Sequence, residues 1–138
     1  MSIKFPSDEW LQALKDKLNS DEKYARIARK WEGDIMFNVE PGGPLTESML
    51  LYIDLWHGEC RAAFVVEESQ RAGVKPAFVL SAPYENLARL LKGELDPMQA
   101  MITRKLRVQG SMAYMMRNVP VVLEFVRCCK AINTEFPE

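Results

Sequence analysis

A methionine-rich segment, residues 77–116, constrains the fold of this chain more than any other part of the sequence. Strand-like and helix-like patterns alternate along it. Five of the eight methionines of the chain fall within it: Met98, Met101, Met112, Met115 and Met116. Methionine is unbranched and polarizable, so it adapts to irregular or variable apolar contents better than leucine or isoleucine does. The segment therefore predicts one wall of an apolar pocket.

Length and composition exclude several classes of protein. A chain of 138 residues suits one domain, 1–138, with a core large enough to need no disulfide or metal. The 18 basic and 19 acidic residues nearly cancel, so the net charge of -1 gives no reason to expect a nucleic-acid partner. Three cysteines form no disulfide framework, which favours a reducing compartment and a cytoplasmic location. No leader or membrane-spanning run is recognised, so we expect a soluble protein.

The first half of the chain predicts two helices and then three strands. Apolar residues at helical spacing indicate a helix over about 8–19, beginning near Ser7 or Asp8, and a shorter one follows over about 21–30. From near Trp31, apolar and polar residues alternate with a period of two, which indicates a strand, and the PGGP sequence of residues 41–44 ends this pattern. Residues 49–56 and 60–67 then predict a hairpin with its turn at 57–59. The three strands form a meander.

The second half returns to mixed patterns. We expect a strand over 77–82, a helix from Pro83 to Gly93, and another helix that Asp96 caps. A short strand over 106–108 precedes a last helical region, which Pro120 must kink or restart. This order predicts an α+β fold rather than regular strand–helix–strand alternation.

Four short sequences within this order carry a resemblance to a known family. They are Trp31-Glu32-Gly33, YIDLWHG at 52–58, ENLARLLKGELDP at 85–97 and KLRVQG at 105–110. The chain resembles the sterol carrier protein family of small intracellular lipid-binding domains over nearly its whole length. The family usually has glycine where this chain has Arg104, and the apolar helix after Pro120 extends beyond the usual core.

The resemblance implies a five-stranded, mainly antiparallel sheet, with helices over one face that enclose an apolar tunnel. It also implies a ligand such as a sterol, fatty acid, acyl-CoA or phospholipid. No cofactor and no metal are implied. The C-terminal helix is expected to act as a lid hinged at Pro120.

We expect the ligand to contact apolar side chains on the inner strand faces and on the helix stripes. Burial of each ligand methylene contributes about 0.8 kcal/mol, so a dozen contribute about 10 kcal/mol before the costs of binding. The expected ligand-binding residues are Phe37, Ile53, Leu55, Phe64, Phe78, Leu80, Leu91, Met98, Met101, Ile102, Val108, Met112, Met115, Met116, Phe125 and Val126.

Signals for other chemistry are weak. His57 and Cys60 have the spacing of half a metal site, but the chain has no other histidine, so we expect no metal. The same two residues are the only evident nucleophile and base, and no catalytic motif surrounds them. Gly42-Gly43 lacks the Lys-Ser/Thr ending of a phosphate loop.

These observations predict an intracellular lipid-binding carrier that is not an enzyme. One alternative is an oligomerisation or accessory module with a closed core and no ligand. A less favoured one is an accessory acyl-handling enzyme. Trp56 is either a floor for the ligand or part of a homodimer interface, and transient membrane contact is expected of a carrier. Arg104, Lys105 or Arg107 could steer an anionic head group, although solvent-exposed basic residues usually serve solubility.

Overall fold

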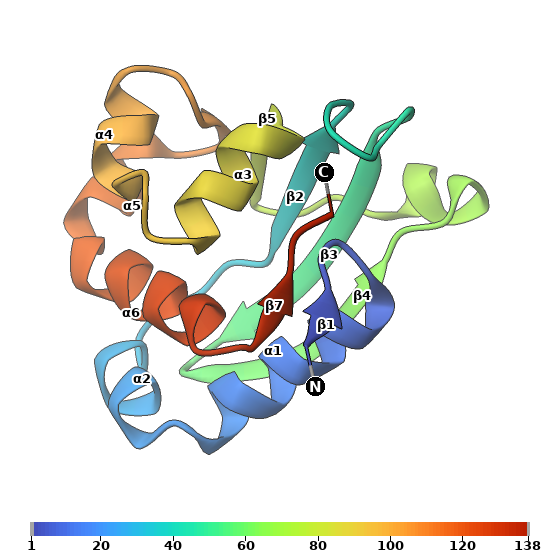
Figure 1. The fold of residues 1–138 in the computed structure, drawn as a ribbon. Coiled ribbons are helices and arrows are strands. Elements are labelled where there is room, and N and C mark those ends of the chain that lie inside the picture. The colour runs from blue at the N-terminus through green and yellow to red at the C-terminus, as the bar shows by residue number, and fades with distance from the viewer. Residues whose placement is uncertain (1, 138) are drawn as a thin grey trace.

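A computed structural model describes residues 2–137 and contains a main sheet of five strands (Figure 1). Their order across the sheet is β4-β3-β2-β5-β6. Three neighbouring pairs are antiparallel and β2–β5 is parallel, so the mainly antiparallel sheet is confirmed. The strands are β2 (Ile35–Glu40), β3 (Met49–Trp56), β4 (Glu59–Val65), β5 (Phe78–Pro83) and β6 (Arg107–Gln109).

Helices lie over one face of this sheet (Figure 1). The short 3₁₀ helix η1 (Glu68–Gly73) instead follows β4 beyond the edge of the sheet. None of the helices in residues 2–137 is both long and apolar enough to cross a membrane. The α-helices are α1 (Asp8–Ser20), α2 (Glu22–Ile27), α3 (Tyr84–Leu91), α4 (Pro97–Ile102), α5 (Met112–Arg117) and α6 (Val119–Lys130).

Side-chain caps fix where four of these helices begin. Each capping oxygen accepts a hydrogen bond from the backbone N–H three residues later, which satisfies a donor that the helix leaves unpaired. The predicted starts near Ser7 and at Asp96 are confirmed. Pro120 lies in the first turn of α6, so it restarts the helix after α5 rather than kinking it. The four caps are Ser7, Asp21, Asp96 and Ser111.

The turn between β3 and β4 lies where the sequence predicts it. His57 and Gly58 have φ values of +50° and +82°, the conformation of a two-residue turn that matches the twist of its strands. Gly58 also lies against the backbone of Ala25 in α2, where a Cβ would come within 2.6 Å of the Ala25 carbonyl oxygen. The absence of a side chain at Gly58 therefore lets α2 lie close to the end of the hairpin.

The two ends of the chain meet on the helical side of the sheet. β1 (Ile3–Lys4) and β7 (Thr134–Glu135) form a two-stranded parallel sheet. The indole Nε1 of Trp10 donates to Oγ1 of Thr134 at 2.9 Å, and the Tyr84 hydroxyl donates to the Pro137 carbonyl at 2.7 Å. No pattern in the sequence predicts this pairing, because each strand has only two residues.

Candidate functional site

An apolar cavity lies between the sheet and the helices, and its floor is one row of side chains across three strands. Leu51 of β3, Phe37 of β2 and Leu80 of β5 lie in register in the sheet. Residues that are directly paired in neighbouring strands point to the same face. The row therefore presents three adjacent apolar side chains to the helices.

The helices and the N-terminal segment supply the walls. Phe125 of α6 stacks on Phe37 with ring centroids 6.2 Å apart, so floor and wall meet. Phe5 and Trp10 contact each other edge to face at 4.8 Å in the N-terminal wall. The other lining residues are Leu87, Leu90, Leu91, Pro97, Met101, Leu106, Met115, Val122, Val126 and Cys129.

The cavity is small and has no polar lining. Its volume is about 50 Å³. At about 10–15 Å³ for each water-sized group, such a void holds roughly four groups, far fewer than a long acyl chain contains. A chain-length ligand therefore requires side chains to move. Met101 and Met115 are adaptable wall residues, and Leu91, Val122 and Val126 are only half-buried.

Seven of the sixteen predicted ligand residues lie together around this cavity. They come from β2, β5 and four helices, so the fold brings together positions up to 89 residues apart, from 37 to 126. The seven are Phe37, Leu80, Leu91, Met101, Met115, Phe125 and Val126.

Ile53, Leu55 and Phe78 are on the expected face of the sheet but not in the cavity lining. Ile53 and Phe78 form the row next to the floor, and Leu55 lies further along β3. The Trp31 ring is tilted against Phe78 and the Tyr114 ring stacks on it, with ring centroids 5.6 and 6.0 Å from that of Phe78. This part of the inner face is filled by aromatic side chains.

Phe64 lies on the opposite face of the sheet. It pairs with Tyr52, and the two rings are 5.1 Å apart. Strand alternation explains the difference, because Ala63 and Val65, not Phe64, share a face with the floor row. Phe64 therefore does not line the cavity.

The remaining five predicted residues lie outside the cavity lining. Val108 of β6 pairs with Leu80, so it continues the floor row on the inner face of the sheet, and both Val108 and Met98 pack against the core. Met98 is half-buried without lining the cavity, and Met116 is exposed. Ile102, Val108 and Met112 line a shallow groove on the surface. Helix geometry explains why Met101 and Met115 line the cavity while their neighbours Ile102 and Met116 are exposed, because adjacent residues on a helix point about 100° apart.

Nine residues of the cavity lining are not among the predicted ligand residues. Leu87 and Leu90 share a helical stripe with Leu91, which was predicted, so their spacing could have identified them. In the same way, Val122 and Cys129 share a stripe of α6 with Phe125 and Val126, and Leu51 alternates with Ile53 along β3. For the other four no sequence signal separates cavity lining from ordinary core. The missed residues are Phe5, Trp10, Leu51, Leu87, Leu90, Pro97, Leu106, Val122 and Cys129.

His57 and Cys60 do not form a catalytic pair. Nε2 of His57 lies 2.6 Å from a Glu32 carboxylate oxygen, whereas the Cys60 thiol donates to the Ala62 carbonyl. Burial raises the pKa of the Cys60 thiol to about 11, so little thiolate exists at neutral pH. Burial also raises the pKa values of the Cys128 and Cys129 thiols. These environments disfavour nucleophilic catalysis.

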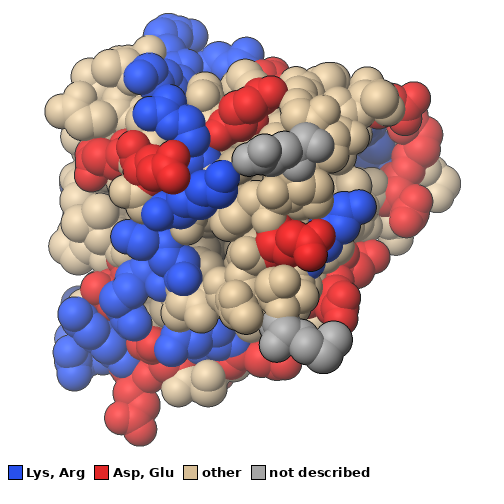
Figure 2. All heavy atoms as spheres, in the orientation of Figure 1, with Lys and Arg blue, Asp and Glu red and all other residues tan. Residues whose placement is uncertain are grey.

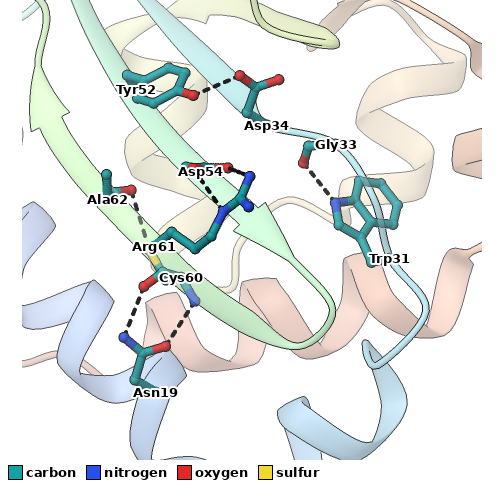
Figure 3. A network of polar contacts seen from close by, with 9 residues as sticks. All are labelled: Asn19, Trp31, Gly33, Asp34, Tyr52, Asp54, Cys60, Arg61 and Ala62. Carbon is teal, nitrogen blue, oxygen red and sulfur yellow. Dashed lines mark hydrogen bonds and ion pairs between the residues drawn. The ribbon is translucent and has the colours of Figure 1, made fainter.

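Polar contacts instead secure the β3–β4 hairpin. The Asn19 side chain accepts from Cys60 N at 2.8 Å and donates to Cys60 O at 2.9 Å, so it ties α1 to β4 (Figure 3). Arg61 contacts both carboxylate oxygens of Asp54 and lies over the Trp56 ring. Within residues 2–137, no group of three or more His, Cys, Asp or Glu residues could hold a metal ion.

Trp56 lies on the outer face of the sheet, away from the helices. Its side chain is exposed, stacks on His57, and does not reach the cavity. The Tyr52 hydroxyl on the same face donates to Asp34 at 2.6 Å. Trp56 is therefore not a floor for a ligand in this cavity, and its role in a homodimer stays a prediction.

Solved structures share this fold over most of their length. A crystal structure of sterol carrier protein 2 has 29% identity and a TM-score of 0.81, and the match covers 91% of this chain and 97% of that one. A conserved hypothetical protein from Thermus thermophilus has 28% identity and a TM-score of 0.82, with 94% and 90% covered. No curated protein matches the chain.

A more distant structure shows the same fold alone. It is sterol carrier protein-2 from Aedes aegypti in complex with palmitate, with 15% identity, a TM-score of 0.53, and coverage of 93% of this chain and 98% of that one. The model of the SCP-2 sterol transfer family matches residues 7–122. That range contains the whole five-stranded sheet and the first five α-helices. The chain belongs to the SCP-2 sterol transfer family.

Proposed function

We propose that this protein binds an elongated apolar molecule, a fatty acyl chain or a sterol-like ligand, between its sheet and its helices and carries it through water. The observation that carries the proposal is the wholly apolar cavity above the row of Leu51, Phe37 and Leu80. Apolar lining without a hydrogen-bonding group selects for hydrocarbon and against polar metabolites. Membership in the family and the palmitate complex of the Aedes protein support the same class of ligand.

Binding requires the cavity to expand from about 50 Å³. The half-buried residues Leu91, Val122 and Val126 give the wall room to move outward, and methionine side chains change rotamer at low cost. Each ligand methylene that leaves water contributes about 0.8 kcal/mol, which is available to offset this rearrangement. No covalent step is part of the proposal.

A matched pair of variants on α6 tests the proposal. Val126→Trp adds volume inside the cavity, whereas Leu123→Trp adds the same side chain at an exposed position of the same helix. We expect Val126→Trp to lower the affinity for a fluorescent fatty acid at least tenfold and Leu123→Trp to leave it unchanged. Circular dichroism and thermal unfolding check that both variants fold. Equal affinities in the two folded variants would contradict the proposed site.

A closed core without ligand is the second candidate, and the small volume of the cavity favours it. It predicts that the wild-type protein takes up no fluorescent fatty acid or sterol. It also predicts that mass spectrometry finds no lipid in organic extracts of gently purified protein. Uptake of either probe, displaced by unlabelled ligand, would exclude it.

A further inference from the structure

Exposed apolar side chains gather around strand β6. Ile102, Met112 and Met116 are 64%, 37% and 48% exposed and make up three of the five large apolar residues that are exposed in residues 2–137. Ile102 and Met112 line a groove of about 380 Å³ together with Val108. Met116 lies one helical turn beyond Met112, on the same side of α5. A grouped apolar surface of this kind marks an interaction site more often than scattered exposed residues do.

Basic residues border this apolar surface. Arg104 and Arg107 line the groove, Lys105 lies between them in sequence, and Arg117 follows Met116. Arg107 pairs with Glu40. Arg104, Lys105 and Arg117 have no carboxylate within 4 Å in the part of the chain that the structure describes, and all three are exposed. The overall charge of -1 therefore conceals local separation of charge. Figure 2 shows that lysine and arginine also form a band down the helical face of the molecule, with patches of aspartate and glutamate beside it.

We propose that this basic-rimmed apolar surface, formed by Ile102, Arg104, Lys105, Met112, Met116 and Arg117, docks onto a bilayer that contains anionic lipids. Unpaired cations attract anionic head groups, and apolar side chains between them insert among the acyl chains. A second copy of the chain would bring its own cations against these. In addition, β6 has only three residues, which gives a second copy little edge to pair with.

The position of the surface connects it with the cavity. Met101 and Leu106 line both the cavity and the groove, so a wall one side chain thick separates the bilayer-facing surface from the interior. Docking itself requires no ligand. Passage of a ligand through this wall rests on the proposed function, so the two ideas need separate measurements.

Flotation of the purified full chain with lipid vesicles tests the docking. We expect binding to vesicles of equal parts phosphatidylcholine and phosphatidylserine, weaker binding at high salt, and none to phosphatidylcholine alone. Arg104→Asn/Lys105→Gln lowers the partition coefficient about fivefold for each cation removed. Asparagine is chosen for Arg104 because that residue has φ +63°, which asparagine tolerates. Ile102→Gln/Met116→Gln lowers the partition coefficient as well.

Lys15→Gln/Arg71→Gln is the matched control. It also removes two cations, one on α1, which contacts β4, and one on η1, which follows β4, so both lie toward the opposite edge of the sheet from β6 (Figure 1). It should bind vesicles like the wild-type protein. Equal flotation of the two charge variants would overturn the proposal, as would no flotation of the wild-type protein. A wild-type dimer in light scattering that Ile102→Gln/Met116→Gln dissociates would instead assign the surface to self-association.

Affinity for a fluorescent fatty acid in the absence of vesicles separates the two proposals. All of the surface variants should keep the wild-type value, because none of the altered residues lines the cavity. Vesicle binding without fatty-acid binding would support docking and count against the carrier function. Fatty-acid binding without vesicle binding would do the reverse.

Discussion

At the scale of single residues, Arg104 has a backbone conformation that its side chain disfavours. Its φ of +63° lies in the left-handed region. That region costs a residue with a Cβ about 1–2 kcal/mol, whereas glycine enters it freely but loses about 0.5–1 kcal/mol through unfolded-state entropy. We expect Arg104→Gly to raise the free energy of unfolding by up to about 1 kcal/mol, measured by equilibrium urea denaturation.

Lys105→Gly is the control for this substitution. Lys105 is not among the residues with positive φ in the described part of the chain, so glycine there brings only the entropic loss of about 0.5–1 kcal/mol. The expected signs of the two effects are opposite. A similar loss of stability in both variants would show that the conformation of Arg104 costs nothing.

At the scale of elements, Asp21 joins the α1–α2 junction to α6. Its carboxylate accepts from the Tyr24 backbone N–H at 2.9 Å and from Arg127 at 2.7 Å, and lies 3.1 Å from Lys17. Hydrogen bonds from Arg127 first, and then from Tyr24, hold the pKa of Asp21 well below its usual range. Since the folded pKa is below the unfolded value of about 3.9, this stabilisation is present above about pH 4 and is lost as pH falls below it.

Asp21→Asn keeps the helix cap but removes the charge. We expect it to lower the free energy of unfolding at neutral pH by about 1–2 kcal/mol. Below about pH 4 its stability should fall less steeply with pH than that of the wild-type protein. Asp16→Asn on the exposed side of α1 is the matched control, and urea titrations at several pH values provide the measurement. Parallel pH profiles for Asp21→Asn and wild type would contradict this account.

Local patterns predicted most elements but not how they meet. Residues such as Asp96 and Pro97 specify a helix start through their own backbone chemistry, so that start needed no tertiary information. The parallel pairing of β2 with β5, and the two-residue strands β1 and β7, depend on contacts between distant segments. For the cavity, the alternation of residues along each strand identified which side chains lie on the inner face of the sheet. It could not show that Trp31 and Tyr114 fill the space over Phe78 while the row at Phe37 stays open.

At the scale of the whole molecule, ligand binding should raise resistance to heat. A ligand that binds only the folded state at about 100 times its dissociation constant adds about 2.7 kcal/mol to the free energy of unfolding. For a domain of this size we expect the Tm to rise by roughly 5–15 °C with a saturating fatty acid. Differential scanning fluorimetry measures the shift. Val126→Trp should show little of it, and an equal shift in that variant would indicate binding elsewhere.

Residues near both ends of the chain close part of the cavity. Phe5, Phe125, Val126 and Cys129 line the cavity but lie outside residues 7–122, the part that matches the family. Under the proposed function, substitutions at these four positions would change the shape of the ligand cavity and leave the sheet unchanged. A fragment trimmed to residues 7–122 would lose these four residues of the cavity lining.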